Sequence, residues 1–154
     1  MNLTTTIRRV CYDEILGAPN AQQLIDEYDA ECSIPLIGKI NPQAGMYAAL
    51  EAAGVMHFFG VYAGDDLVGF ASVVMSIQPH YGLKLATVGD LFVASSHRSG
   101  RTGRSLMDMI EAHARLHECV AILIIAPVDS QLAMVLLASK PYECTNVVFC
   151  RNLA

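Results

Sequence analysis

Residues 86–104 read ATVGDLFVASSHRSGRTGR, and this stretch decides the fold. An apolar strand runs into a short loop of Arg, Gly, Ser and Thr, and Ser105–Ile110 then continue as a predicted helix. Backbone N–H groups in such a loop, together with the positive end of a helix, form a site for phosphate. Arg98, Arg101 and Arg104 add charge that matches phosphate oxygens. In a chain of net charge −5 this local positive charge predicts an anion site.

Length and composition indicate one folded domain that spans residues 1–154. Hydrophobic residues make up 53% of the 154 residues and charged residues 16%, which excludes the disordered class. No apolar run approaches the roughly 20 residues of a membrane span, and the N-terminus shows no signal-peptide pattern. We therefore expect a soluble, cytoplasmic protein without a membrane partner. The acidic balance argues against nucleic-acid binding, which needs a broad basic face.

The five cysteines lie far apart, their number is odd, and no C-x-x-C occurs. This pattern predicts neither a disulfide framework nor a zinc site, and we expect no metal. Free and mostly buried thiols are the better interpretation.

Hydrophobic periodicity and turn residues divide the chain into predicted elements. We expect strands over residues 4–12, 56–63, 67–77, 84–95, 119–126 and 143–152. We expect helices over residues 20–31, 43–53, 102–117 and 129–139. A hairpin signal, Gly64-Asp65-Asp66, joins two of the strands.

The run at 119–126 is continuously apolar, which is typical of a parallel strand buried on both faces. Residues 84–126 then form one βαβ unit. The pattern therefore predicts an α+β (mixed α/β) fold: a central, mostly antiparallel sheet with one parallel βαβ unit and helices on both faces.

This order of elements resembles the GNAT superfamily of acyl-CoA-dependent N-acyltransferases over almost the whole chain. That family carries an [Arg/Gln]-x-x-Gly-x-[Gly/Ala] loop after a strand that ends in Leu-x-Val. Here the strand ends in Leu91-Phe92-Val93, and the loop reads Arg98-Ser99-Gly100-Arg101-Thr102-Gly103. The leading Arg and the closing Gly match, whereas Arg101 stands where the family has its middle Gly.

The resemblance implies acetyl-CoA as cosubstrate and an amine as acceptor. Backbone N–H groups of residues 98–104 would hold the pyrophosphate, and Arg101 or Arg104 would reach the outer phosphate. The pantetheine arm would pair with the strand edge at residues 91–93, where one N–H would stabilise the tetrahedral oxyanion. Ser130 stands at the place of an Asn in the family's last helix. The implied cofactor-binding residues are Leu91, Phe92, Val93, Arg98, Ser99, Gly100, Arg101, Thr102, Gly103, Arg104 and Ser130.

Asp90 stands where the family often has a Glu that acts as base through water, so we expect Asp90 to be the general base. Family members often carry a Tyr in the last helix that protonates the leaving thiolate, but Leu137 stands at that position here. Tyr142 more simply fills core space. Either water protonates the thiolate, or the chain is a poor or non-catalytic relative.

Histidines give weaker signals. His80 lies in a turn near the expected acceptor entrance, and His97 adjoins the loop. His113 and His117 lie on the predicted helix as packing or surface residues, and His57 opens a strand without a visible partner.

Three functions are compatible with these residues. The leading one is an N-acetyltransferase that moves an acetyl group from acetyl-CoA to an amine of a small molecule or peptide by direct attack. The second is a non-catalytic module that keeps the fold and binds CoA or a protein partner. The third is a nucleotide-binding protein, although both the P-loop and the Rossmann patterns are absent. The acceptor and the oligomeric state stay open, and the strand-like tail is compatible with a homodimer.

Overall fold

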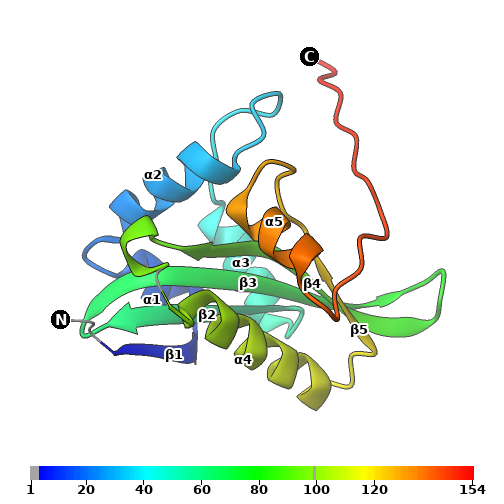
Figure 1. The fold of residues 1–154 in the computed structure, drawn as a ribbon, viewed down its shortest axis with the longest axis horizontal. Helices are drawn as coiled ribbons and strands as arrows, with labels where there is room; N and C mark the ends of the chain where they lie inside the picture. Colours follow the sequence, from blue (N-terminus) through cyan, green and yellow to red (C-terminus); the bar gives the residue numbers. More distant parts are fainter. Residues whose placement is uncertain (1–3, 99) are drawn as a thin grey trace.

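A five-stranded sheet forms the centre of the computed structural model, which describes residues 4–98 and 100–154 (Figure 1). Its strands are β1 (Thr5–Val10), β2 (Met56–Ala63), β3 (Asp66–Gln78), β4 (Leu83–Val93) and β5 (Ala121–Ile124). They follow one another in the order β1-β2-β3-β4-β5. The first three pairings are antiparallel, and β4 and β5 are parallel. This mostly antiparallel sheet with one βαβ unit confirms the predicted fold class.

Helices cover both faces of the sheet. The described helices are α1 (Tyr12–Leu16), α2 (Ala21–Cys32), α3 (Ala44–Ala52), the 3₁₀ turn η1 (Ser95–His97), α4 (Thr102–Leu116) and α5 (Gln131–Ala138). Because side chains alternate along a strand, neighbouring residues of β2 belong to different cores. Phe59 packs with Leu106 and Ile110 of α4 in one core. Phe58 packs with Tyr12 of α1 and Leu24 of α2 in the other.

One extra residue in β4 separates this strand from β5. Asp90 pairs with Ser72 and Val88 pairs with Val73, so Gly89 is the additional residue of a β-bulge. The pairing of β5 covers only Leu85–Val88 of β4. Beyond the bulge, residues 89–93 have no strand partner on the β5 side within the described chain.

The structure corrects the expectation of a final strand. Residues 143–152 have no regular secondary structure and join no strand, and the Asn152 amide donates to the Leu36 carbonyl, in the loop between α2 and α3, at 3.2 Å (Figure 1). The expectation that the fifth strand is buried on both faces is also wrong: Leu123 is 42% exposed, and Ile125, just after β5, is 58% exposed. The run at 119–126 is apolar on both faces, but within the described residues no further strand covers it.

Two further expectations are corrected. The predicted first strand ends at Val10, because Glu14 accepts the Cys11 N–H at 3.2 Å and this capping interaction begins α1. The thiols are not mostly buried, since Cys11, Cys144 and Cys150 are exposed and Cys32 and Cys119 are half-buried. None of the described helices has the length and apolar character that a membrane span requires.

Candidate functional site

Asp90 lies just after the β4 bulge and is held by two hydroxyl donors. The Tyr28 hydroxyl of α2 donates to Oδ1 at 2.6 Å, and Ser72 Oγ of β3 donates to Oδ2. Burial, followed by the neighbouring Asp90 carboxylate, raises the pKa of Tyr28 far above its usual range, so the phenol stays protonated. The carboxylate is therefore fixed in place, while its remaining lone pairs are open to a further donor.

Aromatic rings surround this carboxylate on the α2 side of the sheet. Tyr28 contacts Phe70 and Phe92 edge to face, with ring centroids 5.2 and 5.6 Å apart. Tyr47 of α3 lies close enough that Asp90, after burial, contributes to raising the pKa of its phenol. The result is one carboxylate in a largely aromatic wall, which suits a single cationic group next to apolar surface.

The β4 edge beyond the bulge presents unpaired backbone donors. The N–H of Ala94 donates to the Val68 carbonyl at 2.8 Å, so it faces β3. Because N–H directions alternate along a strand, the Phe92 N–H also faces β3, and those of Leu91 and Val93 face the free edge. An extended amide-bearing ligand can pair there as an additional strand.

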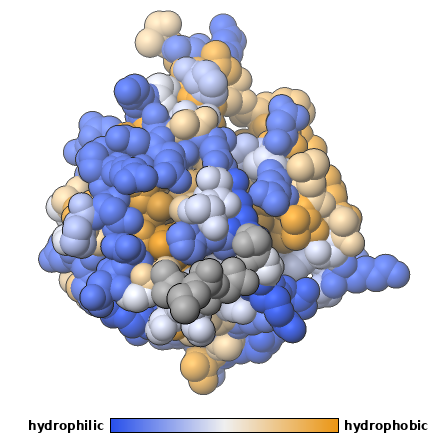
Figure 2. Space-filling model, turned by 60° about the vertical axis from the view of Figure 1, so that its left-hand side comes forward, coloured by the Kyte–Doolittle hydropathy of each residue, from blue (hydrophilic) through white to orange (hydrophobic). Residues whose placement is uncertain are grey.

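The loop after β4 leads these donors to the first turn of α4. Gly100 has φ of +107°, a conformation that side-chain-bearing residues rarely adopt, and Arg101 is the N-cap residue of α4. The N–H groups of the first helical turn have no intrahelical partner. A Cβ at Gly103 would meet no atom within 4 Å, so the helix surface there is open. Figure 2 views this side of the molecule and shows hydrophilic residues around a smaller hydrophobic area.

The three arginines of the loop differ in their surroundings. The Arg98 guanidinium donates to the Val93 carbonyl at 2.7 Å and to Glu31 of α2 at 2.8 and 2.9 Å, so it braces the end of β4 against α2. Arg104 forms an exposed pair with Asp108, with Nε and Oδ1 3.3 Å apart. Arg101 is exposed. Arg101 and Arg104 are thus the cations that a ligand can reach most directly.

The remaining predicted residues have mixed placements. Ser99 lies outside the described residues. Ser130 caps α5 by accepting the Ala133 N–H at 3.1 Å, which is a structural role. Leu137 is 70% exposed and carries no acidic proton. Tyr142 packs on the α4 core, and its hydroxyl donates to Glu111. Burial, and then the contact with Glu111, raise the pKa of Tyr142 to about 12.

The structure therefore brings Asp90, residues 91–93 and the start of α4 together along one strand and the loop that follows it. Sequence reasoning missed Tyr28 and Ser72 as partners of Asp90. The helix expected over residues 20–31 contains Tyr28, but nothing in its spacing shows that it would cover the bulge. Sequence reasoning also missed that His57, His113 and His117 meet on the opposite side of the sheet.

The chain is similar to known proteins in sequence pattern and in fold. Residues 21–138 match the model of the acetyltransferase (GNAT) family. No curated protein shows a significant match to the sequence.

Several solved structures share the fold at low sequence identity. An aminoglycoside acetyltransferase from an uncultured soil metagenomic sample, in complex with trehalose, superimposes with a TM-score of 0.73 at 19% identity, over 97% of each chain. The ribosomal-protein-alanine N-acetyltransferase of Brucella melitensis gives a TM-score of 0.70 at 16% identity, over 96% of this chain and 97% of that chain. Glucosamine-6-phosphate N-acetyltransferase from Arabidopsis thaliana gives 0.68 at 10% identity, over 95% and 98%.

Proposed function

Because this chain belongs to the GNAT acetyltransferase family, we propose that it transfers an acetyl group from acetyl-CoA to an amine by direct attack. The observation that carries the proposal is the unpaired β4 edge that leads, through a glycine-containing loop, to the open first turn of α4. A strand edge suits the amides of pantetheine, and a helix N-terminus suits pyrophosphate.

The cosubstrate would be held mainly by backbone groups. N–H groups from Gly100 to Arg104 would bind the pyrophosphate, where the helix dipole favours negative charge. Arg101 or Arg104 would bind the outer phosphate of CoA. Arg98 would contribute indirectly, because its contacts with Val93 and Glu31 fix the end of β4.

The chemical step follows from the same edge. The neutral amine attacks the thioester carbonyl, and the N–H of Leu91 or Val93 stabilises the oxyanion that forms. The amine proton passes through water to the Asp90 carboxylate, which Tyr28 and Ser72 hold in place. When the C–S bond breaks, the CoA thiolate leaves and takes a proton from water, because Leu137 has none to give.

The acceptor we propose is a small molecule or peptide whose amine is flanked by apolar groups. Asp90 offers one negative charge beside Tyr28, Phe70 and Phe92. The loop between α2 and α3 adds the exposed apolar residues Ile34, Leu36 and Ile37. A polycationic acceptor would need several carboxylates, which this wall does not offer.

Two measurements test the proposal. Isothermal titration with CoA, 3′-dephospho-CoA and ATP should show the tightest binding for CoA. R101A and R104A test which arginine binds the outer phosphate. The variant that lacks this arginine should bind CoA about 10- to 100-fold more weakly and should no longer discriminate against dephospho-CoA. No CoA binding at millimolar concentration, or equal binding of ATP, would contradict it.

Thiol release from acetyl-CoA in the presence of an amine and peptide panel separates the enzyme from the non-catalytic module. The exposed Leu137, where a proton donor is common, is the observation that favours the module. CoA binding without acceptor-dependent thiol release across the panel would support it.

A further inference from the structure

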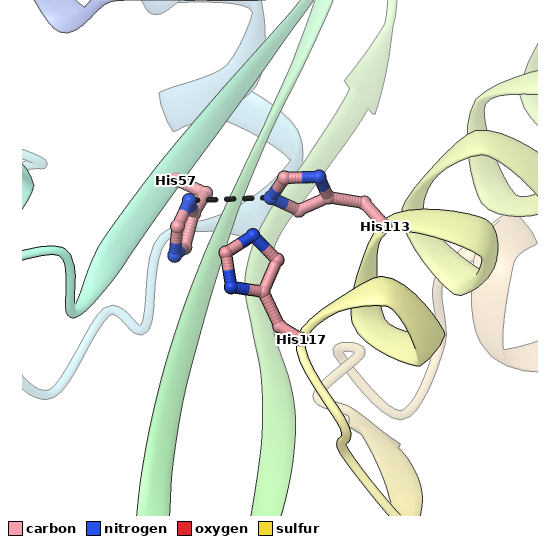
Figure 3. Close-up of side chains that lie close together, drawn as sticks. All are labelled: His57, His113 and His117. Atoms are coloured by element: carbon pink, nitrogen blue, oxygen red, sulfur yellow. Dashed lines mark hydrogen bonds between the residues drawn. The ribbon is translucent and has the colours of Figure 1, made fainter.

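The side chains of three histidines meet between the start of β2 and the C-terminal end of α4 (Figure 3). His57 comes from the start of β2, and His113 and His117 come from the last turns of α4. One ring nitrogen of each lies within 4.8 Å of the others. Nδ1 of His57 and Nε2 of His113 are 3.2 Å apart. We propose that His57, His113 and His117 form a binding site for one divalent transition-metal ion, with Zn²⁺ the best-suited species.

Local structure explains why these side chains converge. Residues four apart in a helix project from the same face, so His113 and His117 lie one turn apart on α4. That face covers β2, where His57 points toward α4 and is 3% exposed. The His113 ring packs against His57, with centroids 4.8 Å apart, and against Phe59 of the core, 5.4 Å away. Packing against the core therefore orients two of the three rings.

The spacing suits tetrahedral coordination. Zn–N bonds of about 2.0–2.1 Å at a tetrahedral angle place two nitrogens about 3.3 Å apart. The His57–His113 separation of 3.2 Å is close to this value. A ring nitrogen of His117 lies within 4.8 Å of the other two ligand atoms and would have to approach them to complete the set. Imidazole is a preferred ligand of zinc, and three protein ligands leave a fourth position for water.

The cluster is incompletely satisfied as a hydrogen-bonding unit. Nε2 of His57 is buried and has no hydrogen-bond partner among the described residues, so a metal bound through Nε2 would satisfy it, whereas a metal bound through Nδ1 would replace the contact with His113. Arg9 and Lys84 carry positive charge close to His57, and this charge opposes that of a bound cation. We therefore expect weaker affinity than in thiolate sites.

This site is distinct from the proposed acetyl-transfer site. His57 packs on the α4 face of the sheet, whereas Asp90 bonds to Tyr28 on the α2 face. Along α4, His113 follows Thr102 by eleven residues, or about 16 Å of helix. A metal ion here would connect the C-terminal part of α4 to β2 and stabilise that junction, whether or not the chain transfers acetyl groups.

The test uses full-length protein without a histidine tag, stripped with EDTA and dialysed. Titration with Co²⁺, followed by visible absorption, should give the bands of a four-coordinate site that saturate at one ion per chain and disappear when Zn²⁺ is added. Zn²⁺ at about 100 times its Kd should raise Tm by about 5–10 °C.

Two sets of variants make the test specific. H113Q and H117Q should each lower Zn²⁺ affinity by more than about 100-fold, since even the loss of a group that only orients a ligand costs about 10–100-fold. H80Q and H97Q change the two histidines outside the cluster and should bind as the parent does. His117 is the less constrained position, so H117Q also serves if H113Q does not fold.

Folded parent protein that shows neither cobalt bands nor a zinc-dependent Tm shift would overturn the proposal. Equal binding by parent and H117Q, or a loss confined to H80Q or H97Q, would do the same.

Discussion

At the scale of single residues, the hydrogen bonds of Asp90 define its chemistry. Two donors, Tyr28 and Ser72, hold the carboxylate in one orientation. A carboxylate held in this way is placed to accept a hydrogen bond from the attacking amine or from the water that carries its proton. The same geometry makes Tyr28 a positioning residue.

The D90N variant tests this role. It keeps the shape but removes the charge, and only its amide oxygen can still accept from a hydroxyl, so we expect kcat with a responsive amine to fall by about 100-fold or more. CoA affinity should not change, because the pyrophosphate donors are elsewhere. Steady-state thiol release and titration with CoA measure the two quantities.

The control for D90N is D65N, in the exposed hairpin between β2 and β3, which should behave as the parent. Unchanged kcat in folded D90N would remove Asp90 from the mechanism but leave the backbone site intact.

At the scale of elements, a substitution in the first turn of α4 should have opposite effects on stability and on CoA affinity. Gly103 has an ordinary helical conformation, and an added Cβ meets nothing within 4 Å. Alanine is a better helix former than glycine by about 1 kcal/mol. We therefore expect G103A to unfold at equal or higher denaturant concentration while its CoA affinity falls, because the methyl group occupies the surface over which the pyrophosphate would lie.

The comparison for G103A is G100A. Gly100 has φ of +107°, so a side chain there strains the backbone and should lower the free energy of unfolding. Chemical denaturation and CoA titration of both variants give the result. Full CoA affinity in G103A would place the pyrophosphate elsewhere.

The contact between Tyr142 and Glu111 attaches the segment after α5 to α4. The pKa of Tyr142 is about 12 in the folded protein, against about 10 in an unfolded chain. A raised folded pKa contributes stability that is present below pH 10 and is lost as the pH rises toward 12. We expect Y142F to destabilise the protein by about 1–2 kcal/mol at neutral pH and to reduce the loss of stability between pH 10 and 12.

Denaturation at a series of pH values measures the Y142F effect. Y81F serves as the control, because Tyr81 is exposed and should change neither quantity. An alkaline profile identical to that of the parent would show that this hydroxyl does not hold the segment.

How far the sequence predicted these elements depends on whether their signals are local. β2 and the start of α4 were predicted at the residues where the structure has them, because Gly64-Asp65 and the loop before Thr102 mark their ends. The tail at 143–152 has a strand-like pattern, but a strand also needs a partner, which a pattern cannot supply. The histidine cluster could not be predicted for a similar reason. The spacing of His113 and His117 indicates that they share a helix face, whereas the approach of His57 depends on how α4 packs on β2.

At the scale of the whole molecule, the free edge of β5 and the tail, residues 143–152, both bear on the oligomeric state. β5 pairs with β4 on one side only within the described residues, and Leu123 and Ile125 are exposed. The tail carries the exposed apolar residues Val147, Val148 and Phe149. An exposed apolar strand edge is a template for another strand. The occupant we propose is the 143–152 segment of a second copy, added to β5 in a two-fold symmetric dimer.

Light scattering after size exclusion tests this arrangement. The parent should elute as a dimer over a range of concentrations, and a chain that ends at Tyr142, which keeps the Glu111 contact, should be a folded monomer. F149K should weaken the dimer because it replaces an apolar ring of the added strand with a charge, whereas N146K places the same charge at a position that is already polar and should weaken the dimer less. A monomeric parent with amide protection in residues 143–152 would show instead that the tail adds to its own β5, and the dimer would then be wrong.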